Sequence, residues 1–313
     1  MNTGLNPSLV KTAIDEVVYP EFDREQEPQE VLASNPVFFK QMTTDRQAVI
    51  TEEYKGPGLF EEHAEEEEIK QATIRTGNQK THTVLNYKKS IKIPVEFYED
   101  EMHSVVAETA EQFGLRARTS RDKHAFSNSY GDAFSGVTTS DGAALISNSH
   151  TAMNGDTIDN LETAALSAAG LETVVKSLRL QKAQDGEVGG HNVVGLLVSP
   201  SDFPDAIEIA ESELQTGTGN NNLNYFSRIY PGMVVGTSAY LDSTYNSANS
   251  NADTSYYVVS RHHTVRRYVR VGLTTSMVSP DTDDADRYTY KARFREVVTA
   301  VSWEGIVGSN GTV

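Results

Sequence analysis

The sequence contains no cysteine, which excludes disulfide bonds and thiol catalysis and leaves the redox compartment open. It also contains no apolar run that approaches the length of a membrane span. Its first stretch, MNTGLNPSLVKTAIDEVVYPEFD, lacks the basic start and apolar core of a signal peptide. We therefore expect a soluble protein that is made in the cytoplasm and does not engage a membrane.

The common catalytic and cofactor-binding motifs are absent as well: there is no GxSxG elbow, Walker loop, GxGxxG after a strand or HExxH pair. His262 and His263 are adjacent, so within a strand they point to opposite faces and cannot chelate one ion together. The acidic run EEHAEEEE lacks the spacing of an EF-hand loop and is typical of a solvated face. We therefore predict no catalytic residues, cofactor or metal site. The enzymatic alternative is a carboxylate-dependent hydrolase on residues 160–260, although no spacing singles out a carboxylate pair.

Acidic and basic side chains are unevenly distributed along the 313 residues, whose formal net charge is −17. Residues 1–70 contain 6 Lys and Arg against 16 Asp and Glu, whereas residues 71–95 contain five bases and no acid. This order predicts a long two-stranded hairpin over Gln47–Val95, with an acidic outgoing strand and a basic returning strand. A bare hairpin is marginally stable in water, so we expect it to lie on another surface, as in a multimer.

A long helix is predicted from Glu96 to Phe134, directly after the hairpin. Apolar and small side chains recur there at steps of three and four residues: Tyr98, Met102, Val105, Thr109, Phe113 and Ala117. Acidic residues come early and basic residues late, which is the charge order that a helix dipole favours. Fully helical, the segment would span about 60 Å, with a bend or break expected near Gly114.

The remaining chain predicts an α+β protein with several short elements. Residues 1–48, interrupted by prolines, are expected to form an arm that packs on another surface, for example that of a neighbouring subunit. A helix from Leu161 to Lys182, a buried strand in HNVVGLLVSP, a helix at PSDFPDAIEIAESEL and strands at 233–241 and 256–260 follow. Asp242–Ser255 is expected to be an exposed, insertion-tolerant loop. Two longer strands are predicted at Thr264–Ser276 and Arg287–Val307.

This order of parts resembles the major capsid proteins of tailed bacteriophages with the Hong Kong 97-type fold, and most of all the Mu-like major head subunits. Four stretches carry the resemblance: the arm with its early helix, the hairpin GPGLF…NYKKSIKIPVEF before the long helix, the block DNLETAALSAAGLETVVKSLRLQKAQDG…LLVSPSDFPDA, and the closing ARFREVVTAVSWEGIVGS. Together they cover most of the chain.

The resemblance implies five parts: an N-terminal arm (1–48), an extended hairpin loop (49–95), a spine helix of the peripheral domain (96–135), an axial domain (136–262) and C-terminal strands of the peripheral domain (263–313). The implied function is an icosahedral shell around double-stranded DNA, located in the virion and assembled in the host cytoplasm. The implied partners are copies of the chain in hexamers and pentamers, a separate scaffolding protein, a portal, a cement protein and DNA bound without sequence specificity. An encapsulin-like nanocompartment shell is the alternative within the same fold.

The charge pattern also predicts where subunits meet. The acidic run that ends at Glu68 is complementary to the basic segments at Arg75–Lys92 and Arg261–Arg270. We therefore predict an assembly interface formed by these residues: Tyr54, Pro57, Phe60, Glu65, Glu66, Glu67, Glu68, Arg75, Lys88, Lys89, Lys92, Arg266, Arg267 and Arg270.

Overall fold

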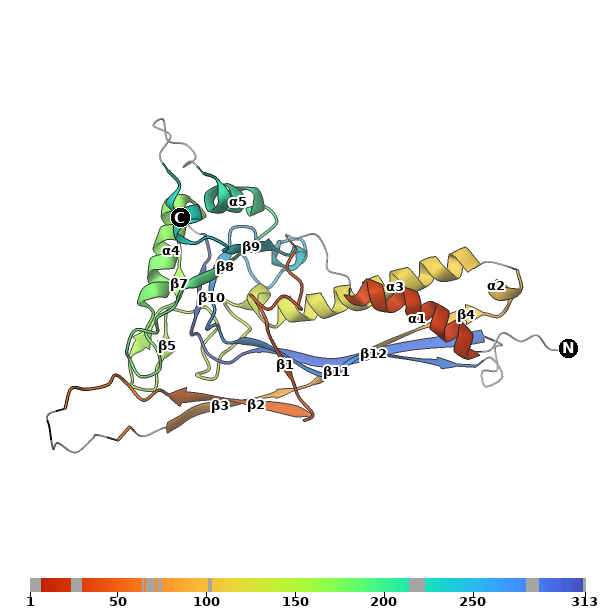
Figure 1. Cartoon of the computed structure of the whole chain (residues 1–313), viewed down its shortest axis with the longest axis horizontal. Coiled ribbons are helices and arrows are strands. Elements are labelled where there is room, and N and C mark those ends of the chain that lie inside the picture. Colours follow the sequence, from red (N-terminus) through yellow and green to blue (C-terminus); the bar gives the residue numbers. More distant parts are fainter. Residues whose placement is uncertain are drawn as a thin grey trace.

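The computed structural model describes residues 7–23, 30–63, 65, 71–72, 75–100, 103–213, 223–279 and 287–311. Its elements form two sheets with helices on them and a hairpin that extends away from both (Figure 1). The first sheet has the strand order β1-β11-β12-β4, and the second has the order β7-β13-β10-β8-β9. The hairpin pairs β2 with β3, and a short separate ribbon pairs β5 (His150–Thr151) with β6 (Thr157–Ile158). This mixture confirms the predicted α+β class.

The first sheet is built from two long strands and two shorter edge strands: β11 (Val265–Val278), β12 (Arg287–Ala300), β1 (Lys40–Thr43) and β4 (Leu85–Pro94). Alternation along β12 buries Tyr290, Ala292 and Phe294 against the helices and leaves Lys291 and Arg293 exposed on the opposite face. The helices α1 (Pro7–Asp23) and α3 (His103–Ser127) cover the apolar face (Figure 1).

The early helix α1 is part of this core, because Val10, Ile14 and Val18 pack with α3 and β12 in one apolar cluster. The following segment is buried too, since Phe38 and Phe39 are fully inaccessible. The prediction that residues 1–48 form an arm on a neighbouring subunit is therefore wrong for the described residues. Pro20 lies inside α1 without ending it, and the apolar stripe of this helix packs against partners within the same chain.

The long helix begins later than predicted, because α2 (Glu96–Glu99) ends at Asp100 and α3 starts at His103. It runs through Gly114 without a break and ends at Ser127. Its buried stripe includes Phe113 as predicted, but in the first half of the helix it is shifted by one residue: Val106 and Ala110 are buried, whereas Val105 is 43% exposed. The shift arises because α1 and the sheet both approach the helix on the face that carries Ala110 and Gly114.

The second sheet combines five short strands: β7 (Leu161–Glu162), β8 (Val193–Val198), β9 (Val234–Thr237), β10 (Tyr256–Ser260) and β13 (Ile306–Ser309). Three helices accompany it: α4 (Ala168–Leu180), α5 (Phe203–Glu211) and α6 (Tyr225–Ile229). The predicted buried strand and the helix after it are confirmed as β8 and α5. The helix expected from Leu161 begins only at Ala168, where the Ser167 side chain accepts a hydrogen bond from the Gly170 amide.

The closing strand is also shorter than predicted, because β12 ends at Ala300 and the chain turns into the second sheet as β13. Gly305 permits this turn with a φ of +76°, and a Cβ there would lie 2.7 Å from the His263 nitrogen. Residues 306–309 therefore belong to the second sheet and not with the strands of 263–300.

The segment Asp242–Ser255 is a loop that is exposed at about half of its positions, including Tyr245 at 69%, but two of its asparagines are internal. The Asn246 side chain donates to the Gly131 carbonyl at 2.7 Å, and the Asn249 side chain donates to the Ser255 hydroxyl at 3.0 Å. Both asparagines are at most 9% exposed. The short 3-10 helices at Tyr130–Asp132 and Ala239–Leu241 lie beside it. Serine and asparagine serve here as internal hydrogen-bonding groups, which composition does not distinguish from solvation.

Candidate assembly surface

The predicted hairpin is present but shorter than Gln47–Val95. Strand β2 (Ala48–Lys55) pairs antiparallel with β3 (Arg75–Thr83), from Ala48 opposite Thr83 to Lys55 opposite Arg75. The expected basic returning strand divides at Val84, because β4 leaves the hairpin and pairs with β12. Lys88, Lys89 and Lys92 therefore lie on the first sheet and not opposite the acidic strand of their own hairpin.

The tip of the hairpin presents large apolar side chains to solvent. Tyr54 is 69% exposed, Leu59 is 72% exposed and Phe60 is fully exposed. Pro57 and Glu65 are exposed beside them, as is Arg75 at the start of β3. Glu66, Glu67 and Glu68, which we predicted as interface residues, lie outside the described residues. An apolar tip on a strand pair with so little support is a surface that another molecule can bury.

The edge strand β4 presents the basic face that the sequence suggested. Lys88 and Lys92 point to the side of the sheet opposite the helices, because their partners Arg293 and Thr289 alternate with the buried Tyr290 and Phe294. A shallow groove of about 560 Å³ follows this face. It is lined by Lys88, Ser90, Thr274, Ser276, Lys291 and Arg293, among others.

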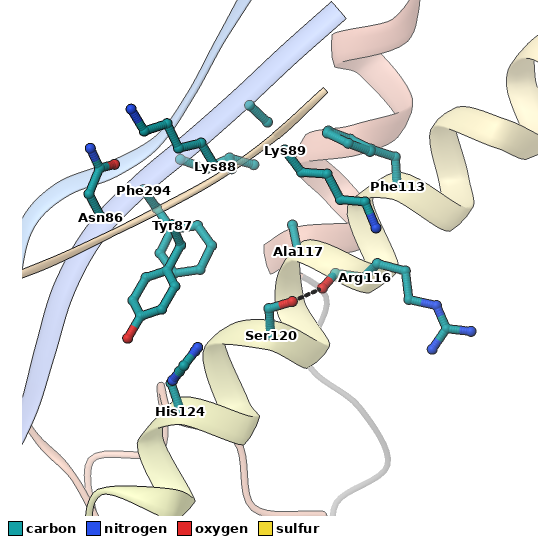
Figure 2. Close-up of a pocket in the computed structure, with 12 residues that line it drawn as sticks. Asn86, Tyr87, Lys88, Lys89, Phe113, Arg116, Ala117, Ser120, His124 and Phe294 are labelled. Carbon is teal, nitrogen blue, oxygen red and sulfur yellow. Dashed lines mark hydrogen bonds between the residues drawn. The ribbon is translucent and has the colours of Figure 1, made fainter. Parts of the chain in front are cut away.

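A second groove, of about 390 Å³, separates β4 from α3. Its floor is aromatic, with the Tyr87 ring 5.0 Å from that of Phe294 and 4.1 Å from that of His124. Lys89 points from β4 toward α3 on the side of Arg116, whereas Lys88 points to the other side of the strand (Figure 2). Burial, with a smaller contribution from Glu296, raises the pKa of Tyr87 to about 12, so the phenol stays neutral. The groove therefore offers an apolar contact surface flanked by the cationic side chains of Lys89 and Arg116.

The basic segment on β11 is different from what the sequence suggested. Arg267 is 8% exposed, and its guanidinium donates to Glu296 at 2.8 Å and to Gln41 at 2.9 Å. The prediction that Arg267 awaits a partner from another subunit is therefore wrong. Arg266 and Arg270 are half-buried, and Arg266 donates to the Tyr268 hydroxyl at 3.3 Å. Of the two basic segments, only the one on β4 is mainly exposed.

The Arg267–Glu296 pair belongs to a buried charge network that sequence reasoning missed. Arg121 and Asp122 of α3 are at most 5% exposed, and Asp122 accepts a hydrogen bond from the Ala33 amide at 3.0 Å. Arg121 lies over the Phe22 ring at 4.6 Å. Arg121 and Asp122 are charged and do not stand out in the sequence as buried residues, although their positions continue the stripe of Ala110 and Phe113 at helical spacing. This helical spacing was the signal in the sequence that indicated buried positions at Arg121 and Asp122.

A polar cavity of about 300 Å³ lies at the base of the hairpin. Glu53 lines it from β2 and Glu304 lines it from the turn between β12 and β13. Three imidazoles also line it: His191, His262 and His263. Within the described ranges, no three His, Asp or Glu side chains are placed to hold a metal ion. Nor is any helix in those ranges long and apolar enough to cross a bilayer.

The sequence of the chain matches one known protein family. Residues 86–309, about seven tenths of the chain, match the family model described as phage capsid protein. The match includes β4 from Asn86 onward, both grooves, the second sheet and the two long strands of the first sheet. It starts after the β2–β3 hairpin and does not include β1. No curated protein matches the chain.

Solved structures match nearly the whole chain at low sequence identity. The virus-like particle from Pyrococcus furiosus matches with a TM-score of 0.52 and 10% identity, over 96% of this chain and 98% of that one. The capsid of Myoviridae phage XM1 matches with a TM-score of 0.52 and 11% identity, over 92% and 94%. The mature capsid of bacteriophage PhiM1 matches with a TM-score of 0.51 and 11% identity, over 92% and 88%. These likenesses confirm the predicted Hong Kong 97-type fold.

Proposed function

The chain belongs to the phage capsid protein family, and we propose that its copies assemble into an icosahedral shell around double-stranded DNA. The family match favours a structural major capsid protein over the nanocompartment and hydrolase alternatives. The observation that carries the assembly proposal is the pairing of an exposed apolar and acidic hairpin tip with an exposed basic strand on the same chain. A surface and its complement on one chain lead to repeated association of copies.

In the proposed contact, the hairpin of one copy lies on β4 of the next. Phe60 and Leu59 supply apolar area, and Glu65 to Glu68 face Lys88, Lys89 and Lys92. Tyr54, Pro57 and Arg75 lie beside the tip and complete its contact surface, while Arg266 and Arg270 are secondary candidates. Each exposed ion pair contributes only about 0–1 kcal/mol, so the charges set register and orientation more than affinity. Closure of a symmetric shell multiplies such weak contacts.

The wider assembly is proposed from the same fold. The first sheet with α1 and α3 corresponds to a peripheral domain, and the second sheet with α4 and α5 to an axial domain. Hexamers and pentamers, a separate scaffolding protein, a portal, a cement protein and assembly in the host cytoplasm complete the proposal. Within the family, Mu-like head subunits are the proposed relatives. The net charge of −17 supports contact with packaged DNA that is weak and independent of sequence.

A charge-swap experiment tests the contact between hairpin and β4. We expect the triple variant Lys88→Glu, Lys89→Glu, Lys92→Glu to fold as the parent does, by circular dichroism, because these side chains are exposed. It should fail to form particles in light scattering. Changing Glu65, Glu66, Glu67 and Glu68 to lysine should also block assembly, and combining both sets should restore part of it.

The control reverses an exposed charge elsewhere: Lys176→Glu on α4 should leave the hairpin contact unaffected. Normal particles from both reversed variants, at low and at high salt, would show that the acidic run is only a solvated surface. Loss of assembly without any recovery in the combined variant would show that the two segments do not bind each other.

A further inference from the structure

The hairpin is attached to the rest of the molecule mainly at its base. The Lys80 ammonium of β3 donates to the Thr138 hydroxyl at 2.6 Å, and His82 hydrogen-bonds with Thr299 at 2.7 Å. Gly77 lies so close to Met153 that an added Cβ would be 2.9 Å from its sulfur. Because β2 and β3 pair only with each other, the hairpin is held by these contacts together with the packing of Val49 and Val84 against Tyr268 of β11.

One group at this base is unfavourable when charged. Glu53 of β2 is 3% exposed and lines the polar cavity, and neither of its carboxylate oxygens has a well-formed hydrogen bond among the described residues. Burial raises the pKa of Glu53 to about 7, and the nearby charges of Asp141 and Glu304 add to the effect, with Asn78 opposing it weakly. A buried carboxyl with so little hydrogen bonding favours its neutral form.

The neighbouring carboxyls keep this environment negative. Burial alone would raise the pKa of Asp141, but hydrogen bonds from His150 and Thr139 outweigh this effect and lower the pKa to about 2. Asp141 is therefore ionised at all relevant pH values. Burial raises the pKa of Glu304, and the charge of Asp185 adds to this.

The titratable and charged groups around Glu53 come from every element that packs there. They are Glu52 and Tyr54 of β2, Lys80 and His82 of β3, Lys40 of β1, Arg266 of β11, Asp141 of the loop after α3, His150 of β5, Asp185 and His191 of the segment after α4, His262 and His263 before β11, and Glu304. Burial lowers the pKa of His82 and His191 to about 4 and that of His263 to about 3. These three imidazoles are therefore neutral between pH 5.5 and 8.5 and do not compensate an ionised Glu53.

We propose that Glu53 is a proton-controlled latch for the hairpin: protonated, it allows β2 to stay docked against the body of the subunit, and ionised, it favours release. The latch goes beyond the proposed function, on which it rests only in taking the hairpin to be the arm that reaches the next copy. Release frees the hairpin to change its orientation relative to the two sheets. The same subunit then has two hairpin states that contact different positions on the next copy.

The sign of the pH dependence follows from the direction of the shift. The docked hairpin binds the Glu53 proton more tightly than a released one, whose carboxyl has an ordinary pKa near 4.5. Docking is therefore strongest at low pH and weakens as the pH rises through about 7. Between pH 5.5 and 8.5 the docking equilibrium should fall by about thirty-fold.

Hydrogen exchange on the unassembled full-length chain tests the latch. Protection factors of the β2 and β3 amides, corrected for the intrinsic pH dependence of exchange, should fall up to thirty-fold between pH 5.5 and 8.5. Those of β8 and β10 in the second sheet should not change. Constant protection of the hairpin base over this range would overturn the proposal without touching assembly, which is measured separately.

The variant Glu53→Gln keeps the shape and cannot ionise. It should lose more than half of the pH dependence of the hairpin amides, whereas the matched control Glu52→Gln, one residue away and exposed, should retain all of it. A Glu53→Gln chain that keeps more than half of the parent's pH dependence would assign the effect to other groups and refute the latch.

Discussion

At the scale of single residues, Gly114 explains how two helices pack so closely. A Cβ at this position would lie 2.7 Å from the carbonyl oxygen of Val18 in α1. Helix propensity alone favours alanine over glycine by about 1 kcal/mol, so the contact must outweigh the local preference. The glycine that suggested a bend in the sequence is instead a contact point between α1 and α3.

We predict that Gly114→Ala lowers the free energy of unfolding by about 1–3 kcal/mol, because α1 must move to admit the methyl group. Urea unfolding followed by circular dichroism measures this. The control Ala107→Gly, on the exposed face of α3, should cost about 1 kcal/mol through propensity alone. A stabilising Gly114→Ala would contradict the close contact between the helices.

A second prediction concerns the buried ion pair between β11 and β12. Arg267→Ala should destabilise the chain by about 3–5 kcal/mol, because it leaves Glu296 buried without its cation. Burial already raises the pKa of Glu296, and Arg267 is the main group that opposes this. Thermal and urea unfolding should show the loss.

The half-buried Arg270 serves as the control, and Arg270→Ala should change stability by no more than about 0.5 kcal/mol. The double variant Arg267→Met, Glu296→Leu should recover most of the loss, since it removes both charges together. Equal, small effects of Arg267→Ala and Arg270→Ala would mean that the pair is not held as described.

At the scale of elements, the sequence predicted which elements exist better than where they pack. The hairpin, the long helix, β8 and α5 all follow from periodicity and charge order, because those signals depend on neighbouring residues. The departure of β4 from the hairpin at Val84 depends on pairing with β12, about 200 residues later, and no local pattern reveals it. For the same reason the sequence placed α1 on another subunit, although its partner is α3 of its own chain.

The hairpin tip provides a prediction at this scale. Replacing residues 59–71 by a short Gly/Ser turn should leave the melting temperature within about 2 °C of the parent, because Leu59 and Phe60 make little contact with the rest of the chain. The shortened subunit should not form particles under conditions in which the parent does. Particle formation by the shortened chain would show that the tip is not needed between subunits.

At the scale of the whole molecule, the sequence was most informative through its resemblance to a family. The order of arm, hairpin, long helix and α/β unit predicted the Hong Kong 97-type fold, which the structural comparisons confirm at about 10% identity. The exposure of the proposed interface residues followed from the sequence only in part. The exposed β4 lysines were identified, but Arg267 was not recognised as internal, since charge alone does not distinguish a surface arginine from one paired in a core.

The most direct test of the assembly model is a cryo-electron microscopy map of particles formed by the purified chain, with its scaffold if one is required. The model predicts closed shells in which the tip around Phe60 of each subunit lies on β4 of a neighbour, with Glu65 to Glu68 facing Lys88, Lys89 and Lys92. Shells in which the hairpin contacts another surface, or a chain that stays monomeric under all such conditions, would contradict it.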